Sequence, residues 1–149
     1  MTIKQKIYNH CLELVNDRIK MLQNVLADLK ESGTNETKST AGDKHETALA
    51  MLQIEQSNTR EQLTDALAKK AMLEKIDPLR ATVKVTNGSL VKTDRGYLFI
   101  SIALGKIRVD DNPVIALSPQ SPLGSKLIGT SSNLSVEINN NKYVIESFD

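Results

Sequence analysis

Several residue types are scarce in this 149-residue chain, and each scarcity excludes a class of protein. One cysteine cannot build a disulfide framework, which agrees with a reducing compartment. There are only two histidines, His10 and His45. A covalent acyl-transfer enzyme would need a cysteine with histidine partners in a much larger fold, so size and composition exclude that class.

Long apolar runs and an excess of charge are missing as well. No stretch of about 18 apolar residues is present to span a membrane. Residues 1–6 lead directly into a charged periodic segment instead of the apolar core of a signal peptide. The net charge of +1 predicts neither DNA wrapping nor adhesion to a membrane surface. We therefore expect a cytoplasmic protein without a membrane partner.

The first half of the chain has helical periodicity. Apolar residues recur at alternating steps of three and four, as in a helix packed on an antiparallel neighbour: Tyr8, Leu12, Val15, Ile19, Leu22, Leu26 and Leu29. This spacing predicts a helix over 2–31. Residues 32–42 have almost no apolar content and many turn formers, which predicts a loop.

The same periodicity resumes after this loop. It is carried by Leu49, Leu52, Leu63, Ala66 and Leu73, and it is interrupted by Gln56, Thr59 and Lys70. An antiparallel hairpin is the natural closure. The second helix should end at Ile76-Asp77-Pro78, because proline disfavours a helical conformation at the preceding residue. The first domain is therefore expected to cover residues 1–77.

In the second half, the period changes to the alternation of β-strands. We expect strands at 81–85, 89–91, 97–102, 114–117, 134–138 and 143–146, forming a small antiparallel sheet. Asn87-Gly88 predicts a hairpin turn and Asn139-Asn140-Asn141 a tight connection. Proline at the start and glycine at the end predict a short helix over 122–129. The class is α+β, with a second domain at 78–149.

Two carboxylates stand where the helical pattern reverses. Asp43 and Glu46 lie in the sequence Gly42-Asp43-Lys44-His45-Glu46, at the expected tip of the hairpin. An Asp-x-x-Glu sequence at a helix start is a capping-box arrangement, worth roughly 1 kcal/mol. The same two oxygen-bearing side chains are also ligands that Mg²⁺ prefers. The residues alone leave both interpretations open.

The second domain contains a serine-proline pair, then small or aliphatic residues, then an aliphatic-glycine pair. The residues in these places are Ser121, Pro122, Leu127, Ile128 and Gly129. Together with the hairpin, this segment resembles the GreA/GreB transcript cleavage factors of bacterial RNA polymerase. The resemblance implies an elongated monomer with an antiparallel coiled-coil hairpin followed by an FKBP-like domain.

The tip matches the family pattern in part. That pattern is glycine-aspartate, two variable residues, then glutamate-asparagine-alanine-glutamate-tyrosine. The matching residues are Gly42, Asp43, Glu46 and Ala48, whereas Thr47, Leu49 and Ala50 replace the asparagine, the second glutamate and the tyrosine. These departures leave open whether the chain stimulates cleavage or only occupies the polymerase.

The resemblance implies an accessory factor and not an enzyme. The hairpin would enter the secondary channel of RNA polymerase and stimulate cleavage of backtracked nascent RNA near its 3′ end. Asp43 and Glu46 would help to hold a Mg²⁺ ion shared with the polymerase, with no cofactor of the chain's own. Ser121, Pro122 and Leu123 would meet the polymerase rim. The alternatives are a non-cleaving channel regulator or inhibitor, and a coiled-coil adaptor.

Two further functions are weighed against the residue types. A prolyl isomerase would need an aromatic-lined pocket, and the aromatic residues of the second half are only Tyr97, Phe99, Tyr143 and Phe148. Cys11 lies beside the helical seam and is expected to pack as a small apolar residue. His10 is adjacent in sequence but on a different helix face, so no metal site is expected there.

Overall fold

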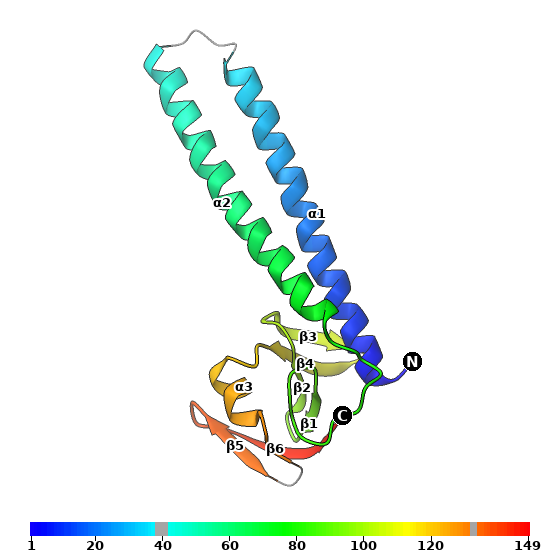
Figure 1. Ribbon diagram of the computed structural model, residues 1–149. Coiled ribbons are helices and arrows are strands. Elements are labelled where there is room, and N and C mark those ends of the chain that lie inside the picture. The colour runs from blue at the N-terminus through cyan, green and yellow to red at the C-terminus, as the bar shows by residue number, and fades with distance from the viewer. Residues whose placement is uncertain (38–41, 132–133) are drawn as a thin grey trace. The chain divides into compact units, whose positions relative to one another are not determined.

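The structure is a computed structural model that describes residues 1–37, 42–131 and 134–149, with side chains described for 1–34, 46–131 and 134–149. Two long helices precede a six-stranded sheet and one short helix, so the expected α+β class is confirmed (Figure 1). The contacts divide the chain into two compact units. We call Leu14–Lys70 the hairpin unit, and Met1–Glu13 with Ala71–Asp149 the sheet unit. Within the described residues, no helix is long and apolar enough to cross a membrane.

Helix α1 covers Ile3–Thr37 and helix α2 covers Gly42–Glu74. In the hairpin unit, the buried side chains of both helices lie at positions of the predicted seam. Its buried members are Val15, Ile19, Leu22, Thr59 and Ala66. Side chains also join the helices: the Gln56 amide donates to the Leu29 carbonyl at 3.3 Å, and the Arg18 guanidinium donates to Gln62 at 3.0 Å.

The ends of the helices differ from the sequence prediction. The loop expected from residue 32 is wrong for residues 32–37, which continue α1. The helix continues there although these residues supply no apolar seam, and the Thr34 hydroxyl donates to the Lys30 carbonyl at 3.1 Å. Residues 38–41 lie outside the described part of the chain. Helix α2 ends at Glu74, close to the predicted stop, and the expected boundary between residues 77 and 78 stays a prediction.

The sheet has the strand order β3-β4-β2-β1-β6-β5. The strands are β1 (Leu90–Thr93), β2 (Gly96–Ile100), β3 (Gly105–Val109), β4 (Asn112–Leu117), β5 (Ser135–Ile138) and β6 (Asn141–Phe148). Strands β2 and β4 pair in parallel, whereas the other pairs are antiparallel, so the sheet is mixed and the expectation of an antiparallel sheet is wrong. Alternation along a strand reveals its faces but not the direction of its neighbour.

Two strand assignments are corrected. Residues 81–85 form no strand of the sheet, in which β1 pairs with β2 and β6, and the main chain of Val85 exchanges hydrogen bonds with Gly129 and Thr130 instead. Asn87-Gly88 therefore makes a turn but no hairpin. Strand β3 was not predicted, although it alternates and ends in a tight turn with positive φ at Asp110 and Asp111. Asn139 and Asn140 have the same conformation between β5 and β6, which confirms the tight connection predicted there.

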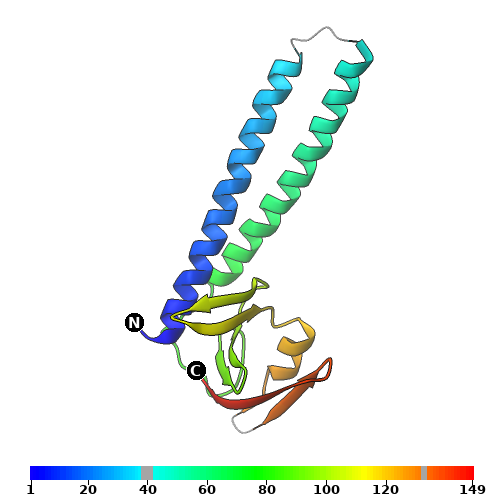
Figure 2. The same ribbon diagram turned by 180° about the vertical axis from the view of Figure 1, so that it is seen from behind.

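Both faces of the sheet are covered. One face packs against α3 (Pro122–Leu127), which lies beside β5 and β6 in Figures 1 and 2. The core on this side contains Val85, Val91, Leu98, Ile100, Leu117, Leu127, Val136 and Ile145. Strand alternation places Leu90, Phe99 and Val114 on the opposite face, where they are also buried.

That opposite face requires apolar cover from elsewhere in the sheet unit. The first turns of α1 and the last turn of α2 belong to this unit, and there Ile7, Cys11 and Leu73 are fully buried. At this end of α1 the buried stripe is shifted by one residue from the predicted seam, since Tyr8 and Leu12 keep partial exposure. The ends of the long helices therefore contribute buried apolar side chains to the sheet unit.

Candidate functional sites

The candidate tip site lies at the first turn of α2. The main chain of Asp43 and Glu46 is helical, and the Glu46 side chain is exposed. The side chain of Asp43 lies outside the described part of the chain, so its distance from Glu46 is a question for experiment. Thr47 is exposed and Leu49 is half-buried, so the position of the family's second acid holds an aliphatic residue that faces inward in part.

The donor chemistry at the tip fits a hard cation in part. Carboxylate oxygens are the protein ligands that Mg²⁺ most often uses, usually one or two of them with waters and phosphate oxygens. In the part of the chain whose side chains are described, no group of three or more His, Cys, Asp or Glu residues could hold a metal. Asp43 and Glu46 could thus contribute to a site that another molecule completes.

Ser121 has a well-defined structural role at the start of α3. Its hydroxyl accepts from the Gly124 N–H at 3.0 Å and donates to the Ser118 carbonyl at 2.7 Å. This is the N-cap arrangement, which satisfies an N–H group that the helix itself leaves unpaired. Of the three predicted contact residues, Ser121 is therefore the one that fixes the local backbone.

The other two contact residues differ in exposure. Pro122 occupies the first turn of α3 and is exposed, which suits a proline because this position needs no N–H. Leu123 is half-buried and packs against the core on the α3 face of the sheet. Gly124 holds the turn tight, because a Cβ there would lie 2.1 Å from the Ser118 carbonyl oxygen. Pro122 is thus the member of the segment that offers its side chain to a partner.

A buried lysine was missed in the sequence. Lys4 is 1% exposed, and its ammonium donates to the main-chain oxygens of Arg80 at 2.8 Å and Asp149 at 2.9 Å. Burial lowers the pKa of Lys4, while the negative charges of Asp149 and Asp77 oppose this shift. Lys4 lies three residues before Ile7 and seven before Cys11, so helical spacing places it on the same buried stripe. Its burial was not predicted from the sequence, because lysine side chains are normally exposed to solvent.

Cys11 and His10 behave as expected from their positions. Cys11 is fully buried, and burial raises the pKa of its thiol to about 12. A thiol in this environment stays protonated at neutral pH and is neither a nucleophile nor a metal ligand. His10 is only half-buried.

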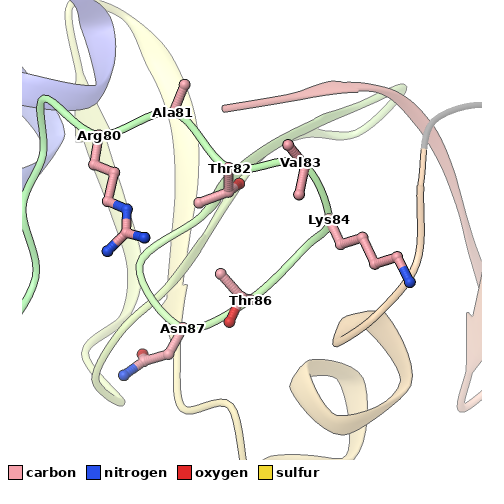
Figure 3. A pocket seen from close by; sticks show the side chains of 7 residues that line it. All are labelled: Arg80, Ala81, Thr82, Val83, Lys84, Thr86 and Asn87. Carbon is pink, nitrogen blue, oxygen red and sulfur yellow. The ribbon is translucent and has the colours of Figure 1, made fainter.

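The irregular segment that replaces the predicted strand at 81–85 surrounds a hollow of about 480 Å³. Figure 3 shows its lining, which consists of Arg80, Ala81, Thr82, Val83, Lys84, Thr86 and Asn87. Two of these residues are cationic and none is a carboxylate. The hollow could not be predicted from the sequence, because the composition of this segment is typical of a strand.

Comparisons with known proteins give little further identification. No protein-family model matches this chain, and no curated protein matches it in sequence. One solved structure that it resembles is described as "Structure of the transcription factor Gfh1", with 15% sequence identity over 95% of this chain and 90% of that chain. The TM-score of that superposition is 0.32.

Proposed function

We propose that the chain is a transcription factor that binds bacterial RNA polymerase, inserts its helical hairpin into the secondary channel, and stimulates cleavage of backtracked nascent RNA. It acts as an accessory factor: the polymerase supplies the substrate, the RNA 3′ end, and the first metal ion. Asp43 and Glu46 would hold a shared Mg²⁺, which supplies charge stabilisation and activates water when bound.

The observation that carries this proposal is the place of the two acids along the chain. Helices α1 and α2 have 35 and 33 residues, so each is roughly 50 Å long at 1.5 Å per residue, and Asp43 and Glu46 lie at the start of α2. Glu46 is exposed there. A carboxylate at the end of a long helical pair can enter a site on another molecule while the rest of the chain binds outside it.

The sheet unit would provide the second attachment through Ser121, Pro122 and Leu123. The cap made by Ser121 fixes the turn, and this fixed turn presents the exposed ring of Pro122. A preformed contact loses little conformational freedom on binding, which favours a stable complex. The two attachments are separable, because one lies at the sheet unit and the other at the helix tip.

A specific feature supports a second candidate, a channel regulator that does not stimulate cleavage. Leu49 and Ala50 replace an acid and an aromatic residue of the family pattern, and the Leu49 side chain is half-buried. A factor with fewer acids at the tip could occupy the channel and inhibit. A coiled-coil adaptor is the third candidate, and the polar residues Gln56 and Thr59 in the seam weaken it.

The decisive experiment uses backtracked elongation complexes of the cognate polymerase. We expect the purified factor alone to cleave no RNA and to accelerate Mg²⁺-dependent cleavage when added to the complex. The double variant Asp43→Asn with Glu46→Gln keeps size and much of the capping ability but removes both charges. It should bind the polymerase with unchanged affinity and lose the acceleration.

A matched control separates the tip from general charge. Asp28→Asn with Glu61→Gln removes two exposed acids elsewhere on the helices and should cleave like the wild type. If the tip variant is folded, bound and fully active, the carboxylates are a helix cap and the cleavage role is wrong. If the wild type binds and slows cleavage, the inhibitor is the correct function.

A further inference from the structure

We propose that residues 79–84 form a docking surface for a protein partner that presents a short, extended, acidic segment, which pairs with the main chain of residues 81–84. This surface lies wholly in the sheet unit and does not depend on the function proposed above. It is the segment whose sequence predicts a strand and whose structure has no strand neighbour.

The main chain of this segment is available for pairing. Within the described residues, the N–H and carbonyl groups of Ala81, Thr82, Val83 and Lys84 have no hydrogen-bond partner. Four consecutive residues with free main-chain groups offer an extended partner the hydrogen bonds of a sheet edge. The chain bends at Val83 and Lys84, so the added ladder would be short.

Both ends of the segment are held in place. On one side, the Leu79 N–H donates to the Asp77 carboxylate at 2.9 Å and the buried Lys4 ammonium donates to the Arg80 carbonyl at 2.8 Å. On the other side, Val85 exchanges main-chain hydrogen bonds with the segment after α3, donating at 3.0 Å and accepting at 2.7 Å. Because its ends are fixed, the segment would lose little entropy when a partner pairs with it.

The side chains indicate the chemistry of the partner. Val83 is 94% exposed and Leu79 is 73% exposed, values far above those of the other large apolar residues in the sheet unit except Met1. Arg80 and Lys84 add two cations to the hollow, whose lining contains no carboxylate. Figure 3 shows the side chains of Arg80 and Ala81 leaving the segment in opposite directions.

These features favour a protein segment over a nucleic acid. Phosphate would be attracted by Arg80 and Lys84 alone and would leave Leu79 and Val83 in water. An extended peptide that alternates carboxylate and β-branched side chains uses the cations, the apolar residues and the free main chain together. The buried Lys4 ammonium fixes the carbonyl of Arg80, which lies next to the pairing site.

The test is a titration of the isotope-labelled full-length protein, followed by amide chemical shifts and amide hydrogen exchange. The probe is a peptide of about seven residues that alternates Glu and Val, long enough for one short strand. Three comparison probes are a Lys–Val peptide, the Glu–Val peptide N-methylated at alternate main-chain nitrogens, and polyuridylate. We expect only the unmodified Glu–Val peptide to slow exchange at residues 81–84, by at least about tenfold when bound.

Three variants locate the contact. Val83→Asp, and the pair Arg80→Glu with Lys84→Glu, should each weaken binding of the Glu–Val peptide by at least about tenfold. Val144→Asp changes a valine of β6 that is 39% exposed, and it should bind the peptide like the wild type. The amide spectrum of each variant outside residues 79–85 serves as the check that the fold is retained.

Each contrary result overturns the proposal in a different way. Equal binding of the N-methylated peptide would mean that no main-chain pairing occurs. Tighter binding of polyuridylate at the same amides would identify a nucleic-acid surface instead. Absence of shifts at residues 81–84 with the Glu–Val peptide, or an equal loss in Val144→Asp, would remove the docking surface altogether.

Discussion

The two units of the chain differ in how completely they bury their apolar residues. In the sheet unit, Val91, Phe99, Ile100 and Ile145 are fully buried, and both faces of the sheet are covered. In the hairpin unit, the seam includes half-buried Gln56 and buried Thr59, while Met51 and Ile54 are about 60% exposed, at 59% and 61%. Most of the stabilising apolar burial therefore lies in the sheet unit, and the hairpin unit is free to carry polar and charged groups.

The largest expected effect concerns which residues the sheet unit needs. A fragment of residues 78–149 lacks Ile7, Cys11 and Leu73, which are fully buried side chains of the sheet unit. We expect this fragment to show no cooperative unfolding transition. A deletion variant, in which a short Gly-Ser linker replaces Leu14–Lys70, retains the whole sheet unit and should unfold cooperatively.

Calorimetry and amide spectra of the two shortened chains measure this difference. A cooperative transition in the 78–149 fragment would show that the helix ends are not part of the core. Failure of the deletion variant to fold would show instead that the hairpin unit stabilises the rest. Either result would contradict the conclusion that the sheet unit, including the helix ends, contains most of the stabilising apolar burial.

The second effect is a pH dependence that should come from the sheet unit alone. The Cys11 thiol has a pKa of about 12 in the folded chain against 9.0 in the unfolded chain, because it is buried. Above pH 9 the unfolded state therefore binds fewer protons, and the free energy of unfolding falls as pH rises, by about 1.4 kcal/mol per pH unit. Below pH 9 this thiol contributes no pH dependence.

Cys11→Ala should remove this loss. The measurement is denaturant unfolding from pH 8 to 11, with the difference between the two pH curves as the readout. The raised pKa of Tyr8, due first to its burial, acts in the same direction, and the lowered pKa of Lys4 acts in the opposite direction. Both groups remain in the variant, so they cancel in the difference. Parallel curves would mean that the thiol is not buried in solution.

The sequence predicted the elements that depend on local pattern. The seam of the two helices, five of the six strands and the short helix α3 follow from periodicity and from Pro122 and Gly129. Three features depended on the tertiary structure. The segment at 81–85 has strand-like residues but forms no strand of the sheet, α1 continues to Thr37 without apolar residues, and Lys4 is buried by groups distant in sequence.

The candidate site was predictable to a different extent. The place of Asp43 and Glu46 in the first turn of α2 follows from the reversal of the helical pattern. The division of labour within Ser121, Pro122 and Leu123 does not follow from sequence, because capping, exposure and core packing depend on the turn that Ser118 and Gly124 form. Residues that look equivalent in sequence can therefore have separable roles.

The third prediction tests the structural member of that segment. Ser121→Ala removes the hydroxyl that accepts from the Gly124 N–H, and it should lower the free energy of unfolding by about 1 kcal/mol. Denaturant unfolding measures the loss. Ser125→Ala is the control, since the Ser125 side chain is exposed and its hydroxyl donates to the Pro122 carbonyl at 3.1 Å, and it should stay within about 0.5 kcal/mol of the wild type.

The smallest effect on stability is expected at Pro122, which is exposed and packs little. Pro122→Arg keeps a residue that a first helical turn accepts, so the melting temperature should change by no more than a few degrees. If this residue meets the polymerase, the same variant should weaken binding, because a bulky charge replaces a flat apolar ring. Binding of labelled factor to the polymerase, measured beside the Ser125→Ala control, separates the two quantities. Unchanged affinity in a folded Pro122→Arg variant would remove this segment from the interface, whereas a large drop in melting temperature would give Pro122 the structural role that the fold assigns to Ser121.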